Sequence, residues 1–438
     1  MTRFVCSPGA SVNGDIRVPG DKSISHRSII LSSIANGRSN ISGFLQGEDS
    51  LNTIRAFRQM GVSIERNADR VRVDGVGLNG LGAPADDLDM GNSGTAMRLL
   101  LGLLAGQSFD SRLIGDASLS SRPMRRVIDP LQSMGALIES ESGGRAPLQV
   151  RASRGLQAIH YDMPVASAQV KSCLLLAGLY ADGETVVREP APTRDHSERM
   201  LRAFGCEVES TDSVIRMRGR QTLTACDVEV PADVSSAAFF MVAASIAPAS
   251  DITLQHVGIN PTRTGVIDIL RLMGAEIELL NRREIGAEPV ADIHVRSAQL
   301  SGIDIPLELV PLAIDEFPVL FVAAACARGT TRLSGAEELR VKESDRIQVM
   351  ADGLSALGIE TQVKDDGIVV EGGQIVGGTV ASHGDHRIAM AFSVASLRAT
   401  QEICIEDCDN VKTSFPEFVE LARVAGLRIT IDGDGDGE

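Results

Sequence analysis

One short pattern occurs six times along the chain: a hydrophobic residue, a glycine and a second hydrophobic residue, followed by a strand-like run. The glycines recur about every 70 residues, which is typical of a chain built from repeated structural units. They are Gly61, Gly135, Gly205, Gly274, Gly358 and Gly426. Before the fourth glycine, the hydrophobic positions 266, 269, 270 and 273 share one helical face. Each copy therefore predicts an amphipathic helix that a left-handed glycine ends, with a strand after it.

A second, Ala-rich helix is predicted near the start of each repeat, after a turn of small residues. The six openings read GDKSISHRSIILSSIA, GNSGTAMRLLLGLLAG, VASAQVKSCLLLAGLYA, ADVSSAAFFMVAAS, AIDEFPVLFVAAACA and HGDHRIAMAFSVAS. One unit then runs strand, buried helix, strand, exposed helix, strand, and three such units can close around their buried helices. We expect two similar three-unit domains that divide near residues 229–231. Hairpin insertions at 280–289 and 301–306 would explain the longer interval after Gly274.

The composition argues against several classes of protein. The formal net charge of −16 disfavours a surface that binds nucleic-acid phosphates, and 3% aromatic residues leave few side chains to stack on bases. No apolar run approaches the roughly 20 residues that span a bilayer. The seven cysteines lack metal-ligand spacing, and the first residues lack the apolar core of a secretory signal. We expect a cytoplasmic protein with reduced cysteines and with no membrane or nucleic-acid partner.

Several basic residues stand where helices are predicted to begin, although the helix dipole favours acidic side chains there. Backbone N–H groups at a helix start bind anions, and Lys or Arg beside them would strengthen such a site. For any one of these cations, a surface ion pair is the alternative interpretation. As a group they indicate an anion pocket built from several repeats: Lys22, Arg27, Arg122, Lys342, Arg346, Arg387 and Lys412.

Two carboxylates beside these cations are candidate proton-transfer groups. Asp315 opens the fifth unit, and Glu343 lies between Lys342 and Arg346. Either could act as a general base toward a substrate hydroxyl within hydrogen-bond reach. A helix cap is the alternative for Asp315, and a solvated ion pair is the alternative for Glu343. The sequence has no zinc pattern and no G-x-S-x-G turn, so it indicates a metal-free enzyme or binder for a small polyanion, with its site between the two domains.

Eight further segments carry a resemblance to a known family. They read VPGDKSISHR (18–27), GNSGTAMR (91–98), GDASLSSRPM (115–124), ASAQVKS (166–172), DEFPVL (315–320), ELRVKESDR (338–346), GDHRIAMAF (384–392) and VKTSFPEF (411–418). Their wording and order resemble the 5-enolpyruvylshikimate-3-phosphate (EPSP) synthase family over nearly the whole chain.

The resemblance implies an α/β fold of two inverse (inside-out) α/β barrel domains. Each domain would contain three of the six repeated βαβαβ-type units. Residues 21–230 would form the N-terminal domain, and residues 1–20 would join 231–438 in the C-terminal domain, so that the chain crosses twice. The acidic tail, residues 432–438, is expected to be disordered.

The resemblance also implies the reaction and its residues. The family transfers the enolpyruvyl group of phosphoenolpyruvate to the 5-hydroxyl of shikimate 3-phosphate, through a tetrahedral adduct and without a cofactor or metal. The implied catalytic residues are Asp315 as base, Glu343 as proton donor to the methylene carbon, and Lys22. Shikimate 3-phosphate would be bound by Lys22, Ser23, Arg27, Ser167, Ala168, Gln169, Arg194, Asp315 and Lys342. Phosphoenolpyruvate would be bound by Lys22, Gly94, Arg122, Gln169, Arg346, Arg387 and Lys412.

Some positions depart from the family pattern. Ala168 stands where many members have Ser, so only its backbone could contribute. Glyphosate-insensitive members often have Ala where Gly94 stands, and sensitive members have Pro where Leu99 stands. This mixed pair predicts intermediate sensitivity. A monomer is the family expectation.

Two other functions stay open at this stage. The first is the sibling enolpyruvyl transferase that acts on UDP-N-acetylglucosamine. It usually has Lys-Asn where this chain has Lys22-Ser23, and it has a reactive Cys in the loop that here reads GDASLSSRP. The second is a non-catalytic repeat protein that binds polyanions. Asp315 and Glu343 argue against it, because carboxylates would weaken such binding.

Overall fold

The six Ala-rich segments form helices that are buried on nearly every side. In the computed structural model, which describes residues 2–432, every residue of α8 (Val234–Ile246) is buried. A helix without a polar face must pack on all sides, so these helices form the interior. The other five are α1 (Lys22–Ile34), α3 (Gly94–Leu104), α6 (Ala168–Gly178), α10 (Phe317–Ala325) and α12 (His386–Ala395).

The six glycines end amphipathic helices, as predicted. Each has φ between 87° and 117°, a left-handed conformation that suits glycine, and a strand follows each one. The helices are α2 (Glu48–Gln59), α5 (Arg125–Ser133), α7 (His196–Ala203), α9 (Gly265–Leu272), α11 (Arg346–Ala356) and α14 (Phe418–Ala425).

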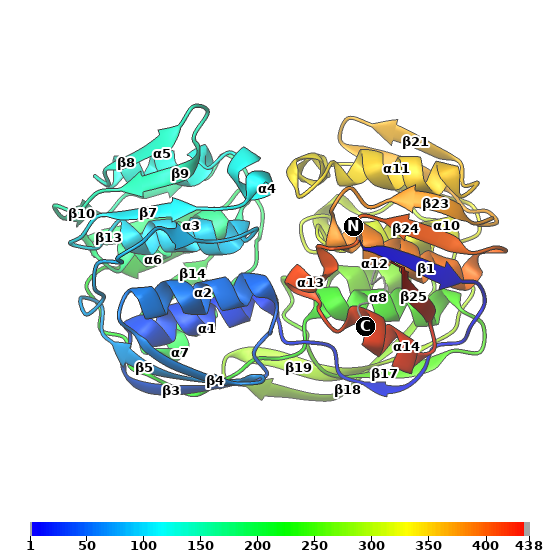
Figure 1. Ribbon diagram of the computed structural model, residues 1–438, viewed down its shortest axis with the longest axis horizontal. Coiled ribbons are helices and arrows are strands. Elements are labelled where there is room, and N and C mark those ends of the chain that lie inside the picture. The colour runs from blue at the N-terminus through cyan, green and yellow to red at the C-terminus, as the bar shows by residue number, and fades with distance from the viewer. Residues whose placement is uncertain (1, 433–438) are drawn as a thin grey trace, which may run out of the picture. The chain divides into compact units, whose positions relative to one another are not determined.

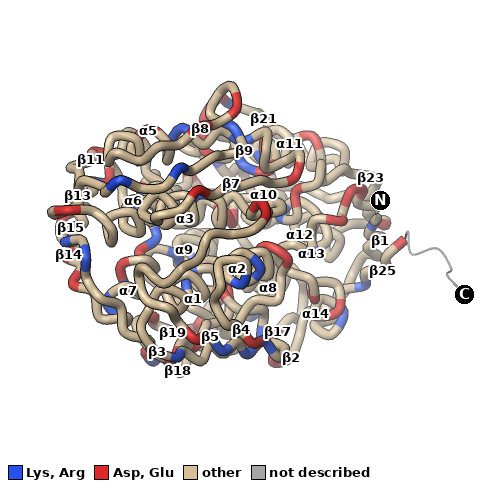
Figure 2. The backbone as a smooth tube through the Cα atoms, turned by 60° about the vertical axis from the view of Figure 1, so that its left-hand side comes forward, with Lys and Arg blue, Asp and Glu red and all other residues tan. Residues whose placement is uncertain are grey.

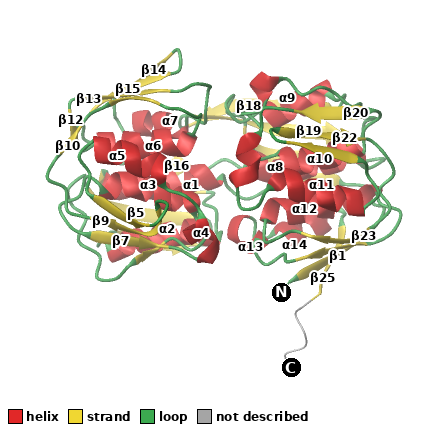
Figure 3. Cartoon of the chain, turned by 90° about the horizontal axis from the view of Figure 1, so that it is seen from above, coloured by secondary structure: helices red, strands yellow, loops and turns green. Residues whose placement is uncertain are grey.

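The chain divides into two compact units (Figure 1). The N-unit consists of Gly20–Val230 and Ile285–Glu288. The C-unit consists of the residues up to Pro19, of Pro231–Glu284, and of the residues from Pro289 onward. Each unit has its own hydrophobic core, as expected of an independent domain. Seen from above, the helices of each unit gather in its middle, and strands lie around them (Figure 3).

Three four-stranded sheets and one strand pair make up the N-unit. In spatial order they are β16 (Val228–Glu229), β3 (Asn36–Ser42), β5 (Arg70–Val76) and β4 (Ser63–Asn67); β6 (Leu88–Asp89), β7 (Ser111–Ile114), β9 (Arg145–Val150) and β8 (Ile138–Glu141); β11 (His160–Asp162), β13 (Glu184–Arg188), β15 (Val214–Arg218) and β14 (Val208–Thr211); and β10 (Leu156–Gln157) with β12 (Ala181–Asp182). A short helix, α4 (Ala117–Ser121), precedes α5.

Three sheets also surround the helices of the C-unit. In spatial order they are β18 (Glu276–Ile285), β19 (Glu288–Arg296), β17 (Asp251–Gly258) and β2 (Asn13–Ile16); β20 (Thr330–Leu333), β22 (Gly367–Glu371) and β21 (Thr361–Lys364); and β23 (Gly378–Ala381), β24 (Ile403–Glu406), β1 (Arg3–Ser7) and β25 (Arg428–Asp432). Short helical segments are α13 (Val411–Ser414), η1 (Leu307–Leu309), η2 (Glu337–Val341) and η3 (Ser396–Arg398).

Two edge strands are exchanged between repeats. Around α3, α6 and α12, the strand before the helix pairs in parallel with a strand after it. By contrast, β2 precedes α1 but pairs with β17, and β16 precedes α8 but pairs with β3. In the C-unit, β2 comes before the chain enters the N-unit and β17 comes after it has returned. In the N-unit, β3 and β16 lie near the two ends of the segment between the crossings. One sheet in each unit is therefore completed by two strands that are far apart in the sequence.

The insertions after Gly274 are only partly as predicted. The hairpin at 280–289 is confirmed, because β18 and β19 are neighbours joined by a turn there. The expected hairpin at 301–306 is wrong. Ser301 and Asp304 form only isolated parallel bridges, with Arg328 and Arg332. Asp432, the expected first residue of the acidic tail, ends β25, and residues 433–438 lie outside the described part of the chain.

Polar and charged residues occupy the surface of both units. Lys and Arg are interspersed with Asp and Glu along the strands and helices (Figure 2), and many form exposed ion pairs such as Arg38 with Asp74. Among residues 2–432, no helix combines the length and apolar character needed to cross a bilayer.

The close packing of α3 on α6 depends on Gly102. A Cβ at this position would lie 2.2 Å from the carbonyl oxygen of Cys173. We expect Gly102→Ala to lower the free energy of unfolding by about 1–3 kcal/mol, because the contact is with backbone that cannot move aside. The control is Gly82→Ala, where a Cβ would meet only the Met60 carbonyl oxygen at 3.6 Å. Denaturant unfolding measures both, and a Gly102→Ala protein as stable as the control would contradict this packing.

Candidate active site

The buried helices of the N-unit begin with cap residues that leave their first turns open to a ligand. Asp21 caps α1, Ser93 caps α3 and Ser167 caps α6, each by accepting a hydrogen bond from the third backbone N–H of its helix. None of the three first turns contains an acidic residue. At α1 and α6 the N–H groups nearest the caps are therefore suited to anions, whereas the Gly94 N–H at the start of α3 already donates to the Asn92 carbonyl at 3.0 Å.

Lys22 is the first residue of α1, and its ammonium forms an ion pair with Asp49 of α2. His26, one turn further along α1, links this helix to the middle of α2 and to the capping residue of α3. Its Nδ1 is 2.7 Å from Thr53 Oγ1, and its Nε2 is 3.4 Å from the capping hydroxyl of Ser93. Burial, together with the charges of Lys22 and Arg27, lowers the pKa of His26 to about 3, so the ring is neutral at ordinary pH.

Arg27 lies inside a buried polar junction between α1, α6 and α7. Its Nε and Nη2 donate to the hydroxyls of Ser197 and Ser172, both at 2.7 Å. Burial lowers the pKa of Arg27 to about 10, and the Glu198 carboxylate opposes that shift. Another cation, Lys171, is 2.6 Å from Glu198 with both side chains only 1% exposed. These contacts fix Arg27 in place but occupy much of its donor capacity. The half-buried Arg194 lies near enough for its charge to act on Arg27.

Gln169, in the first turn of α6, is held against α3. Its amide nitrogen donates to Thr95 Oγ1 at 2.9 Å, and its oxygen accepts from Arg98 Nη1 at 2.8 Å. A Cβ on Gly94 would lie 2.8 Å from that Arg98 nitrogen and 3.4 Å from Arg122 Nη1. Gly94 therefore leaves the space that these two guanidinium groups use.

Arg122 follows α4 directly and bonds to neighbouring polar groups. Its Nη2 donates to Asn92 Oδ1 at 2.8 Å and to Ser118 Oγ at 3.2 Å. Within the N-unit, the structure thus connects Gly94, Gln169 and Arg122 around one helix start, and it holds Lys22, Ser23 and Arg27 on α1. Ser167 and Ala168 precede Gln169 at the start of α6.

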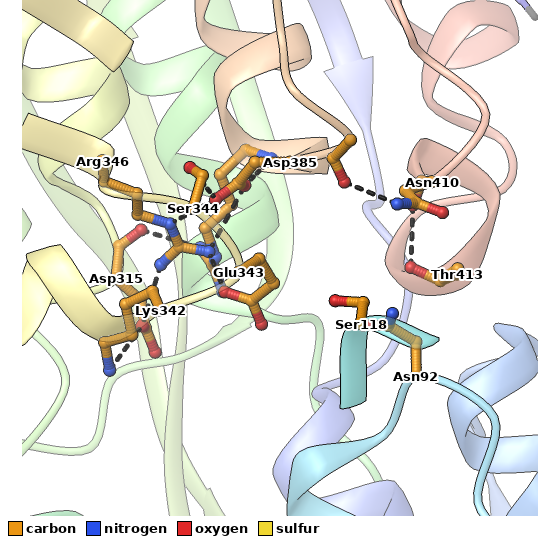
Figure 4. A network of polar contacts seen from close by, with 12 residues as sticks. Asn92, Ser118, Asp315, Lys342, Glu343, Ser344, Arg346, Asp385, Asn410 and Thr413 are labelled. Carbon is orange, nitrogen blue, oxygen red and sulfur yellow. Dashed lines mark hydrogen bonds and ion pairs between the residues drawn. The ribbon is translucent and has the colours of Figure 1, made fainter. Parts of the chain in front are cut away.

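In the C-unit, Arg346 lies among three carboxylates (Figure 4). Its Nε is 2.8 Å from Asp385 Oδ2, its Nη2 is 2.6 Å from Glu343 Oε2, and its Nη1 is 3.4 Å from Asp315 Oδ1. The Arg346 side chain is 1% exposed. Burial alone would lower the pKa of Arg346, but the carboxylates of Asp385, Glu343 and Asp315 together raise it above its usual value.

Asp315 faces a second cation as well. Lys342 Nζ is 3.5 Å from Asp315 Oδ1 and 2.5 Å from Glu338 Oε1. Arg387, in the first turn of α12, donates from Nη1 to the backbone carbonyl of Asp315 at 3.0 Å. The structure therefore brings five predicted residues into one connected group: Asp315, Lys342, Glu343, Arg346 and Arg387. Lys412 is exposed on α13 and makes no hydrogen bond or ion pair with this group in the described chain; its charge acts on Asp409 instead.

Several partners of these residues were missed in the sequence. Asp385 has the strongest signal, because it precedes Arg387 in GDHR and caps α12. Glu316 follows Asp315, and Arg98 ends the GNSGTAMR segment. Nothing in the sequence indicates that Asp49 pairs with Lys22. No group of three or more His, Cys, Asp or Glu among residues 2–432 could hold a metal ion.

Comparison with known proteins gives one consistent result. The family model of EPSP synthase (3-phosphoshikimate 1-carboxyvinyltransferase) matches residues 6–421. The 3-phosphoshikimate 1-carboxyvinyltransferase of Alkalilimnicola ehrlichii is 63% identical over 436 residues, covering 99% of this chain and 98% of that protein. The enzyme of the same name from Methylococcus capsulatus is 62% identical and covers 98% of both chains.

The mixed α/β fold also matches solved structures of EPSP synthase. One from Acinetobacter baumannii superposes with a TM-score of 0.90 at 54% identity, covering 99% of this chain and 100% of that one. A second structure from the same organism gives a TM-score of 0.89 at 52% identity. Because sequence and fold agree over almost the full length, the chain belongs to the EPSP synthase (3-phosphoshikimate 1-carboxyvinyltransferase) family.

Proposed function

We propose that this chain transfers the enolpyruvyl group of phosphoenolpyruvate to the 5-hydroxyl of shikimate 3-phosphate, releasing phosphate through a tetrahedral adduct. The environment of Asp315 is the observation that carries the proposal. A candidate base lies 3.5 Å from Lys342 Nζ and 3.4 Å from Arg346 Nη1, among cations suited to anionic substrates. A protein that only bound polyanions would gain nothing from carboxylates in this place. Family membership supports the same reaction.

Each carboxylate and cation takes a role in this proposal. Asp315 removes the proton of the 5-hydroxyl, Glu343 delivers a proton to the methylene carbon, and Lys22 contacts both substrates and shares in proton transfer. The residues for shikimate 3-phosphate are Lys22, Ser23, Arg27, Ser167, Ala168 through its backbone, Gln169, Arg194, Asp315 and Lys342. The residues for phosphoenolpyruvate are Lys22, Gly94, Arg122, Gln169, Arg346, Arg387 and Lys412.

The chemistry of the substrates explains why many cations are needed. Both substrates are polyanions that repel each other, so their approach requires positive charge that is already in place. Lysines and arginines at helix starts supply this charge together with oriented N–H groups. Holding the hydroxyl and the enol carbon in register removes much of the entropic cost of a reaction between two molecules.

We also infer the finer architecture of the family: two inverse α/β barrel domains of three repeats each, one formed by residues 21–230 and the other by residues 1–20 with 231–438. The six glycine-terminated helices and the two separate cores support this inference. A monomeric state and residence in the cytoplasm stay predictions of the family resemblance.

Phosphate release tests the function directly. The purified protein, mixed with shikimate 3-phosphate and phosphoenolpyruvate, is expected to release phosphate and to form the enolpyruvyl product. The sibling reaction is tested by replacing shikimate 3-phosphate with UDP-N-acetylglucosamine. Release only with the nucleotide sugar would support the sibling enzyme, and release with neither acceptor would support a non-catalytic binder.

Replacement of the proposed base should separate chemistry from binding. We expect Asp315→Ala to abolish measurable turnover while the dissociation constant for shikimate 3-phosphate changes by less than about tenfold. Stopped assays measure turnover, and calorimetry measures binding. The matched control is Asp304→Ala, which removes an exposed carboxylate that pairs only with Arg332. If binding fell in parallel with turnover, Asp315 would be a ligand anchor instead of a base.

A methyl group at position 94 should weaken the binding of phosphoenolpyruvate more than it lowers the stability of the fold. Gly94→Ala would press on the flexible ends of Arg98 and Arg122, which can move aside. We expect KM for phosphoenolpyruvate to rise about tenfold, KM for shikimate 3-phosphate to change less than about threefold, and the unfolding temperature to stay within a few degrees.

The same variant tests the intermediate glyphosate sensitivity predicted from Gly94 and Leu99. Wild-type inhibition as tight as in sensitive members of the family, and unchanged in Gly94→Ala, would contradict that prediction.

A further inference from the structure

Arg387 is held by one nitrogen only. Nη1 donates to the Asp315 carbonyl at 3.0 Å and lies 3.9 Å from Glu316 Oε1. Within residues 2–432, the hydrogen bond from Nη1 is the only one that the Arg387 side chain makes, so Nε and Nη2 are not used by the protein, and the side chain is 15% exposed. These two nitrogens share one edge of the guanidinium group and present two parallel N–H donors, the arrangement that matches a carboxylate or a phosphate. Arg387 is thus held through Nη1, and the edge formed by Nε and Nη2 can bind a ligand.

Arg346 uses the corresponding edge differently. Its Nε and Nη2 both point to Asp385, at 2.8 Å from Oδ2 and 3.4 Å from Oδ1. The two-donor edge of Arg346 is therefore filled by the protein, whereas that of Arg387 is not. The contacts that hold Arg387 therefore determine the direction in which its two parallel N–H donors point toward an anion.

Glu316 is the carboxylate that faces the held side of Arg387. Its side chain is 1% exposed, and Oε1 accepts a hydrogen bond from the Ser235 hydroxyl. Ser235 Oγ in turn accepts from Nη2 of the buried Arg263 at 2.8 Å. The Glu316 carboxylate is thus oriented by Ser235 of α8, which itself accepts a hydrogen bond from Arg263.

Neither helix capping nor full hydrogen bonding explains why a carboxylate stands at position 316. Glu316 occupies the position before α10 but makes no side-chain capping bond, and its Oε2 is buried without a hydrogen-bond partner in the described chain. A buried, half-satisfied carboxylate costs stability, so an uncharged residue would serve the core better. Sites that break packing rules in this way are commonly functional.

We propose that Glu316 is a positioning residue for the reaction: held by Ser235, it fixes Arg387 through Nη1 so that the Nε–Nη2 edge receives an anionic group of phosphoenolpyruvate. This inference rests on the proposed function. It assigns no contact between Glu316 and either substrate.

The test is Glu316→Gln, which keeps the shape of the side chain and its acceptor for Ser235 but removes the charge. We expect KM for phosphoenolpyruvate to rise about tenfold, with KM for shikimate 3-phosphate within about twofold and kcat reduced less than about threefold. Ser235→Ala, which frees Glu316 without removing its charge, should change the same KM in the same direction by about threefold. Glu308→Gln, at an exposed position on η1, is the matched control and should change neither constant.

A double-mutant cycle separates positioning from a general effect on the core. In an Arg387→Lys background, which lacks the two-donor edge, Glu316→Gln should raise KM for phosphoenolpyruvate by less than about twofold further. Equal loss for both substrates, or the same tenfold effect in the Arg387→Lys background, would overturn the proposal. A fall in KM for phosphoenolpyruvate would also overturn it, by showing that the carboxylate only repels the substrate.

Absence of turnover in the wild-type protein would instead refute the proposed function. If Glu316→Gln does not fold, the Ser235→Ala result decides.

Discussion

The buried helices pack against protein on nearly every side, and the chemistry of this protein follows from that constraint. A helix such as α8, buried along its whole length, presents no side to solvent. At its start, backbone N–H groups lack partners within the helix and attract anions. The caps at Asp21, Ser93 and Ser167 satisfy one N–H each, and at α3 the Gly94 N–H also donates to the Asn92 carbonyl. Apolar packing thus places the polar groups suited to phosphate and carboxylate at the helix starts.

Positive charge alone does not describe the candidate site, because carboxylates accompany several of its cations, whereas Arg122 bonds to Asn92 and Ser118 instead. Lys22 pairs with Asp49, Lys171 with Glu198, and Arg346 with three carboxylates. Such pairs hold long side chains in one geometry before a substrate binds, which lowers the entropic cost of ordering them later. They also divide the arginines into two kinds. Arg27 and Arg346 already bond to several protein groups, whereas within residues 2–432 Nε and Nη2 of Arg387 make no hydrogen bond.

Much of this arrangement could be predicted from the sequence, because its signals are local. The glycine that ends each outer helix, the small and apolar residues that predominate in most inner helices, and the cations in their first turns each depend on a few neighbouring residues. Partners distant in the sequence could not be predicted in this way. Asp385 meets Arg346 only because α11 and α12 pack in the same unit, and Asp49 reaches Lys22 only because α2 folds back on α1. The expected hairpin at 301–306 failed for a related reason: the segment pairs with residues near 328–332, not with itself.

The position of β1 has a consequence for the order in which the protein can form. This strand is synthesised before the other strands of the C-unit, yet it lies between β24 and β25, with Phe4 opposite Ile405 on one side and Ile431 on the other (Figure 1). Both neighbours come from the last part of the chain. The first strand of the C-unit must therefore wait, unpaired, while almost all of the remaining chain is made, although Gly20–Val230 can already bury a core of its own. Completion of the C-unit is in this sense a closing step in which β1 pairs with strands made about 400 residues later.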